Sequence, residues 1–109
     1  MIDPRLEKLA KILVDYSVAV KPGENVLVQD TGLEPEFDKA LVRAIHAAGG
    51  RAFVTMRDKA LDRALLKDAP PEQVELQAEF EMARMKKMDC FIGYNAWRNL
   101  SSWCRPLGW

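Results

Sequence analysis

The sequence lacks the patterns that indicate the commonest nucleotide-binding and membrane-bound classes of protein. Neither GxGxxG nor GxxxxGK[ST], the glycine-rich patterns that cradle phosphates, occurs in its 109 residues. No apolar run approaches the roughly 20 residues that a membrane-spanning helix needs, and the amino terminus has no apolar signal region. We therefore expect a protein that is neither exported nor anchored in a membrane.

An excess of charge of one sign is also missing. Lys plus Arg and Asp plus Glu both number 16, so the formal net charge is zero. Such a chain has no long-range field to attract nucleic acid or an acidic membrane surface. With 49% hydrophobic and 29% charged residues, the composition is that of a folded globular protein of about one domain.

Histidine and cysteine are scarce. The one histidine, His46, lies beside an apolar helical stripe without a spacing such as HExxH, so we expect it at the surface or half-buried. Cys90 and Cys104 lack a CxxC spacing and accompany five methionines, so we expect reduced thiols in a cytoplasmic protein. Cys90 would lie in a buried strand, where a thiol is inert. We assign no catalytic, cofactor-binding or metal-binding residue.

Hydrophobic periodicity predicts a strand-helix-strand unit preceded by a helix. Apolar residues at three- and four-residue steps predict a helix from about residue 5 to residue 20 and another from 37 to 48. The run at 26–28 is typical of a strand buried on both faces, and RAFVTM at 51–56 predicts the next strand. A crossover of this kind makes the two strands parallel.

The second half continues the alternation. DKALDRALLK predicts a weaker helix, a longer one follows Pro70-Pro71 to about residue 87, and the apolar residues 90–92 predict a third strand. The fold class is therefore α/β. We expect a three-layer, Rossmann-like module with a small, mainly parallel sheet of about three strands flanked by helices.

The loop after the first strand, QDTGLEPEF, is where many α/β proteins bind a ligand. It has a single glycine, Gly32, and its acids Asp30, Glu34 and Glu36 would repel a phosphate. We expect these acids to cap the following helix. A receiver-like phosphoacceptor role for Asp30 is disfavoured, because the two lysines Lys86 and Lys87 precede the third strand rather than follow one.

The end of the chain has no clear period and carries all three tryptophans, Trp97, Trp103 and Trp109. Large aromatics either cap the sheet or mark a contact surface. We divide the chain into an α/β domain at 1–102 and an atypical tail at 103–109 that is truncated or frame-shifted. The tail is then either disordered or packed against a neighbouring chain.

Several stretches together resemble the amino-terminal domain of the M29 family of metal-dependent aminopeptidases. They are KLAKILVDYS, VKPGENVLV, AAGGRAFV and MDCFIGY, in that order, within a resemblance that covers about residues 3 to 100. The resemblance implies that a larger carboxy-terminal domain of the full-length enzyme holds two divalent metal ions, such as zinc or cobalt, and cleaves peptides. No ligand position of that centre occurs in this chain.

The resemblance therefore implies an amino-terminal fragment that is inactive alone, takes a peptide substrate only as part of the full-length enzyme, and forms a homo-oligomer. One alternative is a stand-alone module that binds a small ligand at the carboxyl ends of its strands, near Asp30, Thr31, Arg57 and Asn95. The other is a self-associating scaffold.

Overall fold

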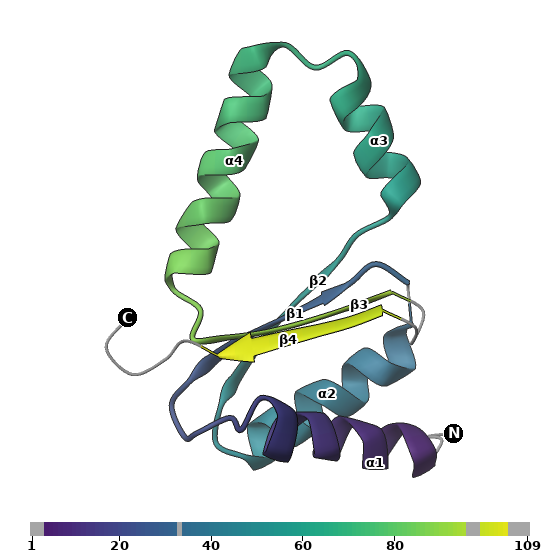
Figure 1. The fold of residues 1–109 in the computed structure, drawn as a ribbon, viewed down its shortest axis with the longest axis vertical. Helices are drawn as coiled ribbons and strands as arrows, with labels where there is room; N and C mark the ends of the chain where they lie inside the picture. Colours follow the sequence, from purple (N-terminus) through teal and green to yellow (C-terminus); the bar gives the residue numbers. More distant parts are fainter. Residues whose placement is uncertain (1–3, 33, 96–98, 105–109) are drawn as a thin grey trace.

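The computed structural model describes residues 4–32, 34–95 and 99–104. Within them the chain forms an α/β unit around a four-stranded sheet of order β2-β1-β3-β4 (Figure 1). The elements are α1 (Pro4–Ile12), the π-helical turn η1 (Leu13–Ser17), β1 (Asn25–Asp30), α2 (Pro35–Ala47), β2 (Arg51–Met56), α3 (Lys59–Lys67), α4 (Pro71–Lys86), β3 (Cys90–Asn95) and β4 (Asn99–Cys104). The predicted α/β class is confirmed.

The central strand is the one that the sequence marks as buried. β1 pairs in parallel with β2 on one side and with β3 on the other, and Val26, Leu27 and Val28 are at most 2% exposed. Their aliphatic side chains suit a strand with neighbours on both edges. The prediction of an interior first strand in a parallel βαβ unit is confirmed.

The fourth strand is a correction to the prediction. Residues 99–104 pair antiparallel with β3, so the tail does contain a regular element, and the predicted division after residue 102 falls inside it. Trp103 stacks on Phe91 with ring centroids 5.7 Å apart, so it is neither disordered nor without a partner. Trp97 and Trp109 lie outside the described residues.

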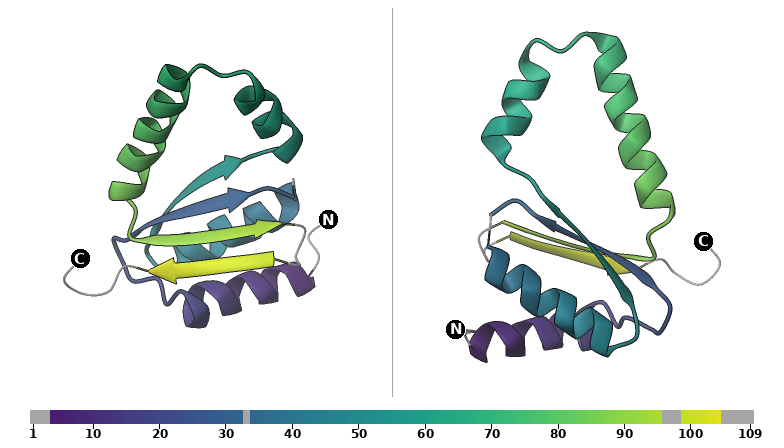
Figure 2. Two further views of the ribbon diagram at one scale, coloured as in Figure 1. Left: turned by 45° about the horizontal axis from the view of Figure 1, so that its top comes forward. Right: turned by 180° about the vertical axis from the view of Figure 1, so that it is seen from behind.

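α1 and α2 lie together on one face of the sheet (Figures 1 and 2). The stripe of α2 predicted from the sequence faces the sheet, and Phe37, Leu41 and Ile45 are at most 1% exposed. They pack with Val14 from η1 and Ile92 from β3 in one core. Gly49 follows the end of α2, and its φ of +87° is the left-handed conformation that glycine adopts without strain after a helix.

α3 and α4 rise from the opposite side of the sheet as a two-helix arm (Figure 1). Neither helix has a buried residue. Exposed apolar side chains occur along both helices: Leu61, Leu65, Leu66, Val74, Leu76, Phe80 and Met82. The radius of gyration is 15.0 Å, whereas a compact chain of this length has about 13 Å. The helices on this side flank the sheet without packing closely onto it.

The sheet face below the arm carries an apolar row that crosses all four strands. Register places Phe53, Leu27, Phe91 and Trp103 side by side. Phe53 is 43% exposed and Trp103 is 36% exposed, whereas Leu27 between the aromatic rings is buried. We call these four residues the aromatic row.

The two cysteines are bonded to each other as a disulfide, so the prediction of reduced thiols is wrong. Cys90 and Cys104 are directly opposite in the antiparallel pair of β3 and β4, with their Cα atoms 4.0 Å apart. Spacing along the chain gave no sign of this register. The cysteines therefore no longer support the predicted cytoplasmic location. None of the helices in the described ranges combines the length and hydropathy needed to cross a bilayer.

Candidate functional site

Two acids and a tyrosine meet at the carboxyl ends of the central strands. Asp30 ends β1, Tyr94 lies near the end of β3, and Asp38 comes from the first turns of α2. From β1 the chain crosses through α2 to β2 on one side, while β3 lies on the other. Ligand sites of open α/β sheets gather where strand order diverges in this way. We call these three residues the carboxyl cluster.

Asp30 holds the loop that leads from β1 into α2. Its Oδ1 accepts a hydrogen bond from the backbone N–H of Gly32, and its Oδ2 accepts one from Glu34, both at 2.8 Å. Burial alone would raise the pKa of Asp30, but the hydrogen bonds from Asp38 and from these two backbone groups outweigh it and lower the pKa. Asp30 is therefore a buried, charged loop anchor.

This geometry corrects the predicted capping role of the loop acids. Glu34 is the N-cap residue of α2, but its side chain makes no capping hydrogen bond. Asp30 bonds the loop rather than the first turn of the helix. The loop is a turn, as expected, but the buried Asp30 stabilises the loop itself, and no side chain of the loop acids makes a capping hydrogen bond to α2.

Asp38 has the opposite environment. It is 5% exposed, and its Oδ1 accepts a hydrogen bond from the hydroxyl of Tyr94. Its Oδ2 is buried and has no hydrogen-bond partner among the residues that the structure describes. Burial, followed by the hydrogen bond with Asp30, raises the pKa of Asp38 to about 7. Of the two neighbouring carboxyl groups, Asp38 is therefore the one that carries a proton in mildly acidic solution and loses it around neutral pH.

Tyr94 completes the carboxyl cluster. Its hydroxyl lies 3.1 Å from the carbonyl oxygen of Glu34, and its ring meets Phe37 edge to face with centroids 4.9 Å apart. Burial and the hydrogen bond to Asp38 raise the pKa of this phenol above its ordinary value. Tyr94 therefore stays protonated and joins β3 to the start of α2.

The four residues predicted to share a ligand crevice do not converge. Thr31 donates both its backbone N–H and its hydroxyl to the carbonyl oxygen of Tyr94, at 3.0 Å each. Asp30 points into the helical layer, whereas Arg57 reaches the arm on the other side. Asn95 is half-buried at the end of β3. All four lie at or just after the carboxyl ends of the strands, as predicted, but their side chains make separate contacts.

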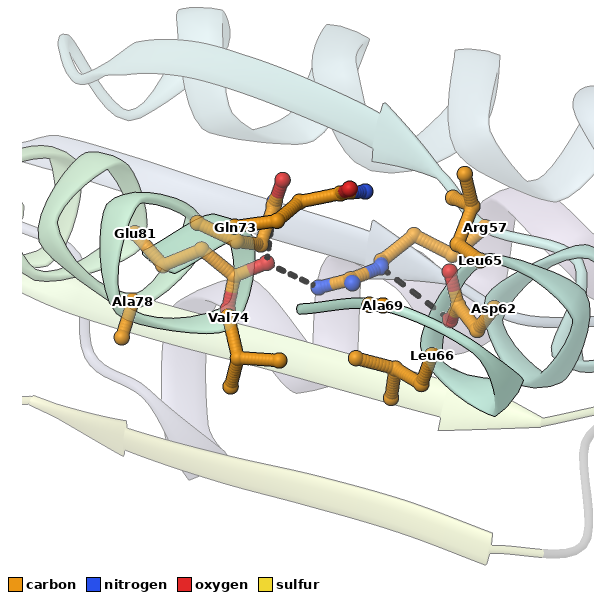
Figure 3. A pocket seen from close by; sticks show the side chains of 10 residues that line it. Arg57, Asp62, Leu65, Leu66, Ala69, Gln73, Val74, Ala78 and Glu81 are labelled. Carbon is orange, nitrogen blue, oxygen red and sulfur yellow. Dashed lines mark hydrogen bonds and ion pairs between the residues drawn. The ribbon is translucent and has the colours of Figure 1, made fainter. Parts of the chain in front are cut away.

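A hollow of about 260 Å³ lies between the two helices of the arm (Figure 3). Arg57 spans it, with Nε 3.3 Å from an Asp62 oxygen and Nη1 2.7 Å from a Glu81 oxygen. Its other walls come from Leu65, Leu66, Ala69, Gln73, Val74, Gln77 and Ala78. Both carboxylates already neutralise the guanidinium, so these ion pairs tie α3 and α4 to the end of β2.

His46 is exposed on α2, as predicted, and belongs to no group of three or more possible metal ligands in the described residues. Among those residues, only Glu24, Cys90 and Cys104 place three atoms suited to a metal near one another. The two sulfur atoms are bonded to each other in this structure.

Asp38 and Tyr94 were not singled out from the sequence, although a signal was present. Asp38 precedes Leu41 by three positions and Ile45 by seven, so it shares their buried helical face. An acid on such a face needs a partner. Which residue supplies it depends on the pairing of β3 with β1, which the sequence does not reveal.

Together, the parallel central strands and the helical crossover between them define a Rossmann-like α/β domain. The model of the family described as thermophilic metalloprotease (M29) matches residues 2–99. The chain therefore belongs to the M29 family.

A solved structure described as wild-type AmpT from Thermus thermophilus is similar to the chain, with 26% sequence identity and a TM-score of 0.52. The similarity covers 62% of this chain and 17% of that one. The chain thus corresponds to less than a fifth of that relative's length. None of the curated proteins compared matches the chain.

Proposed function

We propose that this chain is the amino-terminal α/β domain of an M29 metallo-aminopeptidase and is catalytically inactive alone. In the complete enzyme it would frame the substrate cavity, while the carboxy-terminal domain would hold two divalent metal ions and release amino-terminal residues from peptides. The observation that carries the proposal is the family match over residues 2–99, combined with a donor set that does not fit a two-metal centre.

The lack of fit is chemical. Both oxygens of Asp30 accept backbone hydrogen bonds, and Asp38 is bonded to Tyr94. A hydrolytic metal centre uses several imidazole or carboxylate ligands around an open position for water. His46 is exposed on α2 and joins these acids in no group of possible metal ligands among the described residues. The described residues therefore do not supply such a centre, and we derive no catalytic step from them.

The test is hydrolysis of leucine p-nitroanilide by the purified chain with added Zn²⁺ or Co²⁺, beside a full-length M29 aminopeptidase. We expect no turnover above a metal-only blank. Metal-dependent turnover that copurifies with the chain would overturn the claim of inactivity. If the chain alone is inactive but activity appears when it is mixed with a separately produced carboxy-terminal domain of an M29 enzyme, the domain assignment is supported directly.

We also propose that the protein forms a homo-oligomer through the arm and the aromatic row. A projecting apolar arm and an uncovered apolar row on one molecule are complementary, so two copies related by a two-fold axis can each insert an arm over the partner's sheet. α3 and α4 together expose seven large apolar side chains. Helices that face only solvent carry polar residues at such positions, so this surface is suited to contact with another protein surface.

Sedimentation velocity across a wide concentration range tests this association. We expect the apparent mass to rise with concentration, and Phe80→Glu to prevent the rise because it places a charge in the interface. Lys67→Glu, on the same arm but at an exposed polar position, serves as the control. A monomer at every concentration would overturn the proposal and leave another part of a longer chain as the occupant.

A further inference from the structure

Three metal-binding side chains meet at the end of the sheet opposite the carboxyl cluster. Cys90 begins β3, Cys104 ends β4, and Glu24 belongs to the turn before β1. Their two sulfur atoms and a carboxylate oxygen all lie within 4.8 Å of one another. Oε1 of Glu24 lies 3.9 Å from the Cys90 sulfur.

This group of three side chains is partly buried, and neighbouring backbone groups contact it. Cys90 is completely buried, whereas Glu24 and Cys104 are half-buried, so one side of the group is open to solvent. The backbone N–H of Lys21 donates to Glu24 at 2.6 Å and fixes this carboxylate. The carbonyl oxygen of Val18 lies 2.8 Å from the Cys104 sulfur and adds another oxygen at the rim.

We propose that Glu24, Cys90 and Cys104 form a redox-controlled site for a thiophilic divalent cation, with Zn²⁺ the expected occupant. Two thiolates and a carboxylate supply three of the four ligands that tetrahedral zinc takes, and water fills the fourth position on the open side. Soft sulfur ligands favour zinc over magnesium or calcium. The turn at Glu24 and the β3–β4 register position all three ligands before metal arrives.

The disulfide and the metal site exclude each other. A dithiol reductant transfers two electrons and two protons to the sulfur–sulfur bond, which breaks to give two thiols while the reductant becomes a disulfide. Zinc binding then releases the two thiol protons, because only the thiolate is a ligand. The site would therefore be loaded under reducing conditions. A small-molecule disulfide closes it again: it accepts two electrons from the two thiolates and is cleaved to two thiolates itself, while the Cys90–Cys104 bond re-forms and the metal is released.

Cobalt is the probe for this site, because Zn²⁺ has no visible spectrum whereas thiolate-bound Co²⁺ absorbs in the near ultraviolet and visible. The intact chain is titrated with Co²⁺ after reduction by dithiothreitol and removal of the reductant under anaerobic conditions. We expect a saturable sulfur-to-cobalt band at one ion per chain, bleached by Zn²⁺. The oxidised chain should give no band.

Variants separate the roles of the ligands. Cys104→Ser should abolish the band, and Glu24→Gln should weaken Co²⁺ binding about tenfold or more and change its visible spectrum. Glu36→Gln, an exposed acid on α2, should match the unaltered chain. Circular dichroism checks that each protein is folded.

Several results would overturn the proposal. They are the absence of a band in the reduced chain, a band that survives Cys104→Ser, or Co²⁺ binding that is indifferent to Glu24→Gln. If reduction unfolds the chain, recovery of structure on adding Zn²⁺ supports the site, because ligation is then coupled to folding. Unfolding that Zn²⁺ does not reverse counts against it.

Discussion

The pKa values of Asp30 and Asp38 are shifted in opposite directions because the surroundings of the two carboxyl groups differ. Asp30 accepts from two backbone N–H groups and keeps its charge. Asp38 is buried beside Asp30 and under the coulombic influence of Glu34, and the hydrogen bond from Tyr94 does not offset these effects. The environment of each carboxyl, rather than its chemical type, therefore sets its pKa.

The raised pKa of Asp38 predicts how stability depends on pH. Unfolding returns this carboxyl from about 7 to its ordinary value of 3.8, so its favourable contribution is complete below about pH 4 and is lost as pH rises through 7. At about 1.4 kcal/mol per pKa unit, the loss is on the order of 4 kcal/mol. Urea unfolding of the chain from pH 4 to pH 8 measures it.

Asp38→Asn should remove most of this dependence between pH 4 and pH 7, because an amide has no proton to lose. Asp30 has a lowered pKa, so its contribution is present above its ordinary pKa and lost in acid, and the variant should keep that acid-side decline. Glu36→Gln is the control on the same helix. An unchanged slope in Asp38→Asn would show that another group carries the titration.

At the scale of elements, a disulfide cross-links β3 to β4, whereas no cross-link joins β1 to β2. The disulfide closes a loop with a sequence separation of 14. A cross-link over a loop of about 15 residues stabilises a fold by about 3 kcal/mol in the chain-entropy model. Reduction should therefore affect this edge of the sheet before the central strands.

Cys104→Ser should lower the free energy of unfolding of the oxidised chain by about 2 to 4 kcal/mol. Chemical denaturation with and without dithiothreitol measures this. Dithiothreitol should bring the unaltered chain close to the variant and leave the variant unchanged. Equal stabilities of the variant and the oxidised chain would mean that the cross-link does not constrain the unfolded state.

Truncating a leucine to alanine should cost more stability in the α1–α2 pair than in the α3–α4 arm. Leu41 in α2 is completely buried, whereas Leu66 in α3 is 57% exposed. Leu41→Ala should cost about 2 to 5 kcal/mol because it leaves a cavity in the core, and Leu66→Ala should cost about 0.5 kcal/mol or less. Thermal denaturation of the two variants compares them, and a large loss in Leu66→Ala would mean that the arm is packed.

The sequence predicted most elements because their signals are local. The β-branched and aliphatic run of β1, the stripe of α2 and Gly49 after its last turn each decide a structure within a few residues. β4 and the disulfide were missed because both arise from the register of two strands, and residues 99–104 have no strong alternation of their own. The carboxyl cluster was missed for the same reason, since Asp38 finds Tyr94 only after β3 pairs with β1.

At the scale of the whole molecule, the two sides of the sheet are unequally covered. α1 and α2 cover one face of the sheet (Figure 2) and enclose a continuous core. On the other face, the aromatic row and the arm expose apolar side chains. Fewer buried contacts mean a lower free energy of local opening. The molecule should therefore consist of a stable half and an arm that opens independently.

Hydrogen exchange tests this inequality and the proposed self-association in one experiment. In dilute solution, amides of α4 should exchange faster than those of β1 by a factor of 100 or more, about 2.7 kcal/mol in opening free energy. At high concentration, protection should rise in α4 and in the strands of the aromatic row, but not in α1, because the partner covers only the open side. Phe80→Glu should remove the concentration dependence and leave the dilute pattern intact. Protection of α4 equal to that of β1 in dilute solution would show that the arm is stably folded onto its own sheet.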